Sequence, residues 1–371
     1  MRRFKLMQLN TRQQKVVEST KPKILCLATA GSGKTRALTE RIRYLIEVRK
    51  VRPQDIVAFS FTNMAAEEIK KRLGDMANGA YIGTIHGYAN RILVANGFDT
   101  INYIQNQLFD KILEKALTIS KSKLPEIVHL LIDEAQDLSP LEYHFIERLP
   151  TKNIAFFGDE LQMIYKFRGS SIAYIEDMFL NTEFEKYYLI EDYRNPPDIL
   201  SFAQEFTNNC TKFRPKGVAV KKENGYIEKC SFPSALEVLE EDGDWGNWFI
   251  LTRTNAELAE AQQLLKEREI PNITFKKGDL ELSQLEELML TNNVKLLTVH
   301  SSKGLQAPNV IVVGARTYCE EERLIAFVAA TRAEEQLFWC PSYKANSRFK
   351  KRSESTCVGQ LFKGDQDVVA F

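Results

Sequence analysis

The sequence predicts an α/β fold in which parallel sheets are covered by helices on both faces. Two observations support this prediction. Short apolar segments rich in β-branched and aromatic residues alternate with longer amphipathic segments along the chain, as in strand–helix–strand units. The composition, with 44% hydrophobic and 27% charged residues, is that of an ordinary globular protein. At about 150 residues per domain, the 371 residues predict two or three domains.

The candidate elements follow one another in a regular order. The candidate strands are Lys23–Ala28, Ile56–Ser60, Ile127–Ile132, Asn153–Phe157, Tyr187–Ile190, Trp248–Thr252, Ile273–Phe275, Val294–Val299, Val310–Val313 and Gln336–Cys340. The candidate helices are Thr35–Val48, Ala65–Leu73, Pro197–Phe206 and Asn255–Lys266. Leu38, Ile42 and Leu45 share one face of the first of these helices, which is the spacing of a helix with one buried face. The polar and basic stretches 208–226 and 340–356 are expected to be solvated loops.

Charge, cysteine content and hydropathy exclude several classes of protein. Lys and Arg number 50 and Asp and Glu 49, so the net charge of +1 excludes binding of polyanions through bulk charge, although it permits a local basic groove. The six cysteines form no C-x-x-C pair and the histidines number only four, which indicates neither a zinc site nor a disulfide framework. The start of the sequence has no apolar core of signal-peptide length, and no apolar run approaches about 18 residues, so we expect neither a signal peptide nor a membrane span. We therefore expect an intracellular, cytoplasmic protein without a membrane partner.

The strongest local motif is the segment Ala28-Thr-Ala30-Gly31-Ser32-Gly33-Lys34-Thr35, which follows a candidate strand and opens a candidate helix. This is the context of a phosphate-binding P-loop, in which glycines let successive N–H groups point at phosphate oxygens. Lys34 is then expected to reach the β- and γ-phosphates, and the Thr35 hydroxyl to bind Mg²⁺. Ala28 replaces the first glycine of the general pattern.

A phosphate-binding turn requires a metal ligand and a group that orients water, and two adjacent acidic residues are candidates for these roles. Asp133 and Glu134 follow the apolar strand Ile127–Ile132 directly. In a parallel α/β sheet this position lies beside the phosphate-binding turn. Asp133 is expected to hold Mg²⁺, directly or through water, and Glu134 to position or deprotonate the attacking water.

These two motifs belong to a longer series that resembles one family, the UvrD/Rep/PcrA group of superfamily 1 DNA helicases. The series runs in the family's order from Leu9 to about Glu335. Besides the two motifs above it contains Leu9-Asn10-Thr-Arg-Gln13, Phe61-Thr-Asn63-Met64, Gly83-Thr84-Ile-His86, Gly158-Asp159-Glu-Leu-Gln162-Met-Ile-Tyr165-Lys-Phe167-Arg168, Asp192-Tyr193-Arg194, Thr298-Val-His300-Ser-Ser-Lys-Gly304-Leu-Gln306 and Thr331-Arg332-Ala. The resemblance implies two tandem RecA-like P-loop domains with the ATP site in the cleft between them.

The resemblance also implies which residues handle ATP. Gln13 is similar to the side chain that reads adenine, Tyr193 to the ring that stacks on it, and Gln162 to the γ-phosphate sensor. Arg194 and Arg332 match two arginines that stabilise charge on the transferring phosphoryl group. The implied catalytic residues are Lys34, Asp133, Glu134, Gln162, Arg194 and Arg332, with Mg²⁺ on Thr35 and Asp133. The implied ATP ligands are Gln13, Ala30, Gly31, Ser32, Gly33, Lys34, Thr35, Arg36, Tyr193, Arg194, Gly304, Gln306 and Arg332.

Single-stranded DNA and its junctions with duplex DNA are the implied macromolecular partners. Aromatic side chains can stack on any base while polar groups hold phosphates, so such binding tolerates any sequence. The residues implied to contact DNA are Phe61, Asn63, Thr84, His86, Tyr165, Phe167, Arg168, Thr298 and His300. Phe61 also continues the apolar run Ile56–Ser60, so burial in the core is the alternative for this ring.

Three positions depart from the family pattern. Met64 replaces a usual lysine, which removes one expected backbone contact to DNA. Asp192 stands where the family commonly has asparagine. Gln306 replaces the glutamate that holds the ribose in the family, so we expect altered discrimination between ATP and dATP.

Spacing predicts the domain organisation. His86 and Asp133 are 47 positions apart, and Arg194 and His300 are 106 apart. In the family these gaps hold large accessory insertions, and here they are too short for them. We expect a first motor domain at residues 1–190, with a small helical insertion at about 99–125, and a second motor domain at 191–371 with little or no insertion.

The expected activity is ATP-driven movement along single-stranded DNA, 3′ to 5′ by analogy, with unwinding of duplex DNA in repair, replication or recombination. Two alternatives remain open. One is a translocase that strips proteins from single strands without separating duplexes. The other is a nucleotide-gated subunit of a larger DNA-processing complex. A monomer is one of the open oligomeric states.

Overall fold

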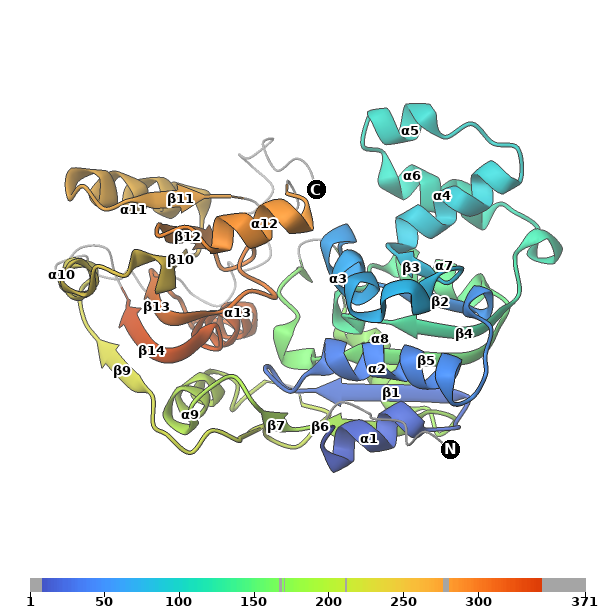
Figure 1. Ribbon diagram of the computed structural model, residues 1–371, viewed down its shortest axis with the longest axis horizontal. Coiled ribbons are helices and arrows are strands. Elements are labelled where there is room, and N and C mark those ends of the chain that lie inside the picture. The colour runs from blue at the N-terminus through green and yellow to red at the C-terminus, as the bar shows by residue number, and fades with distance from the viewer. Residues whose placement is uncertain (1–8, 167–168, 170, 211, 276–279, 342–371) are drawn as a thin grey trace. The chain divides into compact units, whose positions relative to one another are not determined.

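The computed structural model describes residues 9–341, apart from 167–168, 170, 211 and 276–279 (Figure 1). The chain forms two compact units. Unit 1 comprises Met1–Ile190 with Lys212–Lys216, and unit 2 comprises Glu191–Thr211 with Gly217–Phe371. The chain therefore leaves unit 1, returns to it for a short segment, and then completes unit 2.

Unit 1 contains a six-stranded parallel sheet in the order β3-β2-β4-β5-β1-β6. The strands are β1 (Lys23–Ala28), β2 (Ile56–Phe59), β3 (Tyr81–Gly83), β4 (Ile127–Ile132), β5 (Thr151–Gly158) and β6 (Glu185–Leu189). The helices are α1 (Thr11–Glu18), α2 (Lys34–Glu47), α3 (Asn63–Leu73), α4 (Ile85–Ala95), α5 (Ile101–Gln105), α6 (Phe109–Leu117), α7 (Pro140–Arg148) and α8 (Ile172–Leu180). Because β1 lies inside the sheet, the turn that follows it is flanked by the ends of β5 and β6.

Both faces of this sheet are buried, as the continuous apolar strands predict. Side chains alternate along β1, so Leu25 and Leu27 pack into the core under α4, α6, α7 and α8. Ile24, Cys26 and Ala28 pack into the opposite core under α1, α2 and α3. In Figure 1, α4, α5 and α6 lie together at one end of unit 1.

Several helices of unit 1 begin at side chains that cap them. Asn10 and Gln13 form a reciprocal capping box at the start of α1, and Ser139 and Glu142 form another at α7. Thr62 and Thr84 cap α3 and α4 because each side chain accepts the backbone N–H of the residue three positions further along, Ala65 and Gly87 respectively. These caps fix where the helices that carry the expected site residues begin.

Unit 2 contains a second six-stranded parallel sheet, in the order β11-β12-β10-β13-β14-β9. The strands are β9 (Tyr226–Lys229), β10 (Trp248–Thr252), β11 (Asn272–Thr274), β12 (Val294–Thr298), β13 (Ala307–Val313) and β14 (Ala333–Cys340); β7 (Glu191–Asp192) and β8 (Val218–Ala219) form a separate parallel pair. The helices are α9 (Pro197–Phe206), α10 (Phe232–Asp242), α11 (Asn255–Glu267), α12 (Leu282–Met289) and α13 (Glu320–Ala330). One core lies between the sheet and helices α10 and α11, and α9 packs on α13 and β14.

The two parallel sheets confirm the predicted α/β fold, and every candidate strand and helix overlaps an observed element of the same type. The expectation that residues 208–226 form a solvated loop is wrong for Arg214, which is only 7% exposed. The part of the chain that the structure describes contains no helix long and apolar enough to cross a membrane.

Candidate nucleotide site and nucleic-acid interface

The turn between β1 and α2 has the backbone of an anion-binding loop. Gly31 and Gly33 adopt positive φ angles of 70° and 75°, a conformation that glycine reaches without strain. Gly33 occupies the N-cap of α2 and offers no side chain to satisfy the first N–H groups of the helix. Ser32 instead folds back and donates its hydroxyl to the Thr29 carbonyl at 2.7 Å. The start of α2 therefore presents backbone N–H groups and the positive end of a helix dipole.

Lys34 meets the two predicted acids in unit 1. Its Nζ lies 2.5 Å from Glu134 Oε2 and 3.4 Å from Asp133 Oδ1. Burial lowers the pKa of Lys34, but the carboxylates of Glu134 and Asp133 outweigh it and raise this pKa above its ordinary value. Lys34 is therefore held as a cation beside the loop by the carboxylates of Asp133 and Glu134.

Thr35 and Asp133 form a pair of oxygen ligands that suits Mg²⁺. Thr35 Oγ1 donates to Asp133 Oδ2 at 3.3 Å. The described residues contain no cluster of three or more His, Cys, Asp or Glu that could enclose a metal. Mg²⁺ characteristically binds through one or two protein oxygens together with water and substrate phosphates, so this sparse donor set fits that ion.

Glu134 is held in an unusual backbone conformation immediately after β4. Its φ of 52° lies in the left-handed region, which costs a non-glycine residue about 1 kcal/mol or more. Its carboxylate also accepts from Gln136 Nε2 at 2.5 Å. The conformation and the hydrogen bond together aim the Glu134 side chain at the phosphate-binding turn, where Lys34 contacts it.

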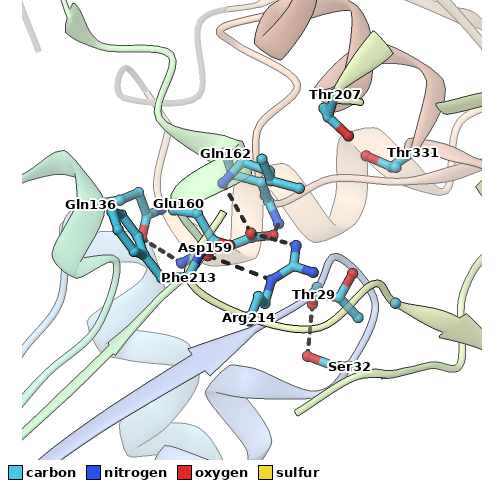
Figure 2. A network of polar contacts seen from close by, with 12 residues as sticks. Thr29, Ser32, Gln136, Asp159, Glu160, Gln162, Thr207, Phe213, Arg214 and Thr331 are labelled. Atoms are coloured by element: carbon cyan, nitrogen blue, oxygen red, sulfur yellow. Dashed lines mark hydrogen bonds and ion pairs between the residues drawn. The ribbon is translucent and has the colours of Figure 1, made fainter. Parts of the chain in front are cut away.

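A chain of polar contacts links Glu134 to Gln162. Figure 2 shows its part from Gln136 through Asp159 to Gln162. Gln136 is fully buried, and its Oε1 accepts from the Asp159 backbone N–H at 2.9 Å. Asp159 Oδ2 in turn accepts from Gln162 Nε2 at 2.7 Å. We predicted no role for Gln136 or Asp159 from the sequence. Gln136 lies two positions after Glu134 and Asp159 three positions before Gln162. This position within the two motifs is the only signal in the sequence that could have identified them.

Gln13 contacts the phosphate-binding turn itself. Its Nε2 donates to the Ser32 carbonyl at 2.9 Å, and its Oε1 accepts from the Asn10 backbone N–H at 3.1 Å. A Cβ added at Gly33 would lie 2.9 Å from Gln13 Nε2, so this close approach requires glycine. Ala30 is buried beside the turn, and Arg36 is partly buried in the first turn of α2. Both amide ends of Gln13 are thus already engaged at this position.

In unit 2 the two expected arginines meet around Thr331. Arg194 Nη1 donates to the Thr331 carbonyl at 3.3 Å. Arg332 is 1% exposed and donates to Val328 O at 2.9 Å, Leu305 O at 3.2 Å and Thr331 Oγ1 at 3.3 Å. Tyr193 is 44% exposed, as a ring available for stacking must be.

Asp192 and Asn195, on either side of this arginine, fix its backbone. Asp192 Oδ1 accepts from the N–H groups of Arg194 at 2.8 Å and Asn195 at 3.1 Å. Asn195 Nδ2 donates to the carbonyls of Thr331 at 3.2 Å and Ala333 at 2.6 Å. Because the capping atom is an oxygen that asparagine also has, the aspartate preserves the local geometry.

Gln306 is exposed, follows the exposed Gly304, and donates to Glu334 Oε1 at 2.7 Å. The Glu334 carboxylate thus lies beside Gln306, the position at which the family has a glutamate.

The residues expected to contact DNA in unit 1 fall into two groups. Phe61 stacks on Tyr165 with ring centroids 5.1 Å apart, and both rings are partly exposed. Asn63 is exposed at the start of α3. Thr84 caps α4, and His86 lies edge-on to Phe109, with its Nδ1 3.7 Å from Glu142 Oε1. Phe167 and Arg168 lie outside the described residues.

The residues expected to contact DNA in unit 2 are at the end of β12. Thr298 donates its hydroxyl to Ser301 Oγ at 3.0 Å and accepts the Ser301 N–H at 3.2 Å, which fixes the turn carrying His300. Thr298 and His300 are both partly exposed. Within each unit, therefore, the expected residues gather at the carboxyl ends of parallel strands.

Comparison with known proteins agrees with this geometry. Residues 9–126 and 97–182 match the UvrD/REP helicase N-terminal domain, and residues 245–343 match the UvrD-like helicase C-terminal domain. The chain belongs to the UvrD/REP helicase family. The two parallel sheets are accordingly the two RecA-like domains of this helicase family.

Individual relatives support the same assignment. The chain is 26% identical to ATP-dependent DNA helicase PcrA of Staphylococcus aureus over a 330-residue alignment, which covers 63% of this chain and 44% of the relative. It is 28% identical to ATP-dependent DNA helicase PcrA of Bacillus subtilis over 313 residues, with 58% and 42% covered. For DNA helicase II of Escherichia coli the identity is 26% over 292 residues, with 54% and 40% covered. The chain thus spans less than half the length of these relatives.

Proposed function

We propose that this protein is an ATP-dependent DNA helicase that uses Mg²⁺, moves along single-stranded DNA in the 3′ to 5′ direction and unwinds duplex DNA. The observation that carries the proposal is the cluster at the phosphate-binding turn. Lys34 contacts both Glu134 and Asp133, and Thr35 contacts Asp133. These are the groups needed to bind a nucleoside triphosphate and activate water against its γ-phosphate. The chain's similarity to the ATP-dependent DNA helicases PcrA of Staphylococcus aureus and Bacillus subtilis supports the same activity.

Each residue of unit 1 has a distinct part in the proposed hydrolysis. The N–H groups at the start of α2 and Lys34 Nζ bind the phosphates. Thr35 and Asp133 would hold Mg²⁺, which supplies positive charge to the β- and γ-phosphate oxygens when bound. Glu134 accepts the proton of the attacking water, while Gln162 orients that water and senses the γ-phosphate. Arg194 and Arg332 of unit 2 stabilise charge on the transferring group.

Single-stranded DNA binding is proposed for the strand ends of both units. Phe61 and Tyr165 are the aromatic pair of unit 1 that would stack on bases, and Asn63, Thr84 and His86 would hold the backbone. Thr298 and His300 would do so in unit 2. Stacking on aromatic faces does not depend on base identity, so we expect binding without sequence preference.

A translocase without unwinding activity is the second candidate, and one observation favours it. Between His86 and Asp133 the structure holds only the rest of α4, the helices α5 and α6, a short 3-10 turn at Lys121–Lys123, the strand β4 and the connections between them. The family resemblance implies accessory insertions here that engage duplex DNA, and the short insertion reduces that surface. The two candidates share the same ATP chemistry and differ only in strand separation.

One experiment tests the proposal and separates the candidates. ATPase activity is measured with and without single-stranded DNA, followed by strand displacement on duplexes with 3′ or 5′ tails. DNA-stimulated hydrolysis with displacement of 3′-tailed duplexes supports the helicase. Stimulation without displacement supports the translocase. Absence of stimulation refutes both.

A further inference from the structure

A short segment from the second half of the sequence completes the polar network of unit 1. After α9 the chain adds Lys212–Lys216 to unit 1 before continuing to β8. Within this segment the Arg214 side chain is 2% exposed. A basic residue in a polar stretch is ordinarily solvated, because burial of a guanidinium is costly without compensating acceptors. Its burial here therefore indicates specific partners.

Those partners are the two carboxylates at the end of β5. Arg214 Nη2 donates to Asp159 Oδ1 at 2.8 Å, and Arg214 Nε lies 3.5 Å from Glu160 Oε2. Nη1 donates to the Pro215 carbonyl at 3.2 Å, and the Phe213 N–H donates to Glu160 Oε1 at 3.3 Å. Asp159 and Glu160 side chains are 1% and 0% exposed. Two adjacent buried carboxylates thus share one guanidinium, whose rigid fork reaches both (Figure 2).

The carboxylate that Arg214 holds is also the one that positions Gln162. Asp159 Oδ2 accepts from Gln162 Nε2 at 2.7 Å, and Asp159 Oδ1 accepts from the Leu161 N–H at 3.1 Å as well as from Arg214. The Asp159 N–H donates to Gln136, which donates to Glu134. Arg214 is therefore two contacts from Gln162 and three contacts from Glu134, and the intervening residues Asp159 and Gln136 are buried.

Loss of the Arg214 guanidinium would remove the counter-charge of Asp159 and Glu160. Asp159 and Glu160 would be left as adjacent buried acids without a counter-charge, and at least one would take up a proton or rotate towards solvent. Asp159 is the only one of the pair that fixes Gln162. Burial raises the pKa of Glu160 to about 7, even though the positive charge of Arg214 lowers it. A negative charge at this buried position is therefore unfavourable even with Arg214 in place.

We propose that Arg214 is a positioning residue for ATP hydrolysis. Through Asp159 it holds the Gln162 amide in the orientation that hydrolysis requires. Arg214 acts through Asp159, whereas the phosphates are proposed to bind at the start of α2 and at Lys34. We therefore expect Arg214 to affect the turnover rate more than nucleotide affinity. The inference rests on the ATPase activity proposed above.

The test is a double-mutant cycle on DNA-stimulated ATPase activity. Arg214→Ala should lower kcat about 10- to 100-fold and change KM for ATP less than about threefold. In a Gln162→Ala background the same change should lower kcat less than about threefold, because the group that Arg214 positions is already gone. Equal fold-losses in the two backgrounds would show a merely structural role and overturn the proposal, as would a loss confined to KM.

Two further variants protect the test against unfolding. Arg214→Lys keeps one charge in the pocket, is expected to recover part of kcat, and replaces Arg214→Ala in the cycle if that variant does not fold. Arg148→Ala is the matched control, because Arg148 donates to the Ile119 carbonyl at 2.6 Å in the same unit, away from Asp159. Its kcat should equal that of wild type even where its thermal stability falls. A wild-type protein without ATPase activity refutes the proposed function instead, so the two failures are distinguishable.

Discussion

Replacement of Asp192 by asparagine should stabilise unit 2 at neutral and alkaline pH. Asp192 is fully buried, and its Oδ1 accepts two backbone N–H groups. Its Oδ2 is buried without a hydrogen-bond partner among the described residues. Burial raises the pKa of Asp192 from 3.8 to about 6, although the two N–H donors and the charges of Arg194 and Arg332 oppose this shift. The carboxylate is therefore better solvated in the unfolded chain than in the folded one.

The sign and size of the effect follow from this pKa. Below pH 3.8 the carboxyl is protonated in both states and costs nothing. Between pH 3.8 and about 6 the carboxyl is ionised in the unfolded chain but still largely protonated in the folded one, so the folded state loses stability as pH rises through this range and the loss is complete above it. A shift of about two pKa units corresponds to about 3 kcal/mol, and we expect a gain of about 2 kcal/mol for Asp192→Asn at pH 8. The gain should vanish near pH 4.

The assay is urea unfolding of wild type and Asp192→Asn between pH 4 and pH 8, followed by circular dichroism, which reports on both units. Asp55→Asn is the control, because the hydrogen bond from Arg52 lowers the pKa of Asp55 and its removal should give no gain at alkaline pH. A stability gain for Asp192→Asn that is independent of pH, or no gain at pH 8, would contradict the raised pKa of Asp192 in the folded protein.

Three further predictions concern the proposed activity. Lys34→Ala should reduce ATP hydrolysis to the background rate while the fold, followed by circular dichroism, is kept; residual activity near that of wild type would contradict the assignment of the phosphate site. Gln306→Glu should change the ratio of KM values for ATP and dATP, because it places a second carboxylate beside Glu334; identical ratios in the two proteins would count against a sugar contact. Phe61→Ala should weaken binding of single-stranded DNA by about 1–3 kcal/mol in fluorescence anisotropy, with the same loss for mixed and homopolymeric sequences. An unchanged Kd would remove Phe61 from the interface.

The sequence predicted the parts of the site that lie on strong local patterns. Lys34 follows a glycine turn and Glu134 follows an apolar strand, and the topology of a parallel α/β sheet brings such strand ends together. The strand Tyr81–Gly83 escaped prediction because three residues at the edge of a sheet carry no measurable periodicity. It nevertheless precedes the motif that carries Thr84 and His86.

Arg214 shows what sequence patterns cannot reveal. It lies in a polar, basic stretch that resembles a solvated loop, and its partners Asp159 and Glu160 are more than 50 positions away in the sequence. Its burial depends on the return of the chain from unit 2 to unit 1, which is a property of the tertiary fold. The contact between Gln306 and Glu334 is of the same kind, because two adjacent strands bring these residues together.

We propose that hydrolysis at Lys34 and Glu134 serves movement on single-stranded DNA. The ratio of ATPase rates with and without a single-stranded oligonucleotide tests this link. We expect stimulation of at least about tenfold in wild type and none in Lys34→Ala. A wild-type rate that is unaffected by single-stranded DNA at saturating ATP would contradict it.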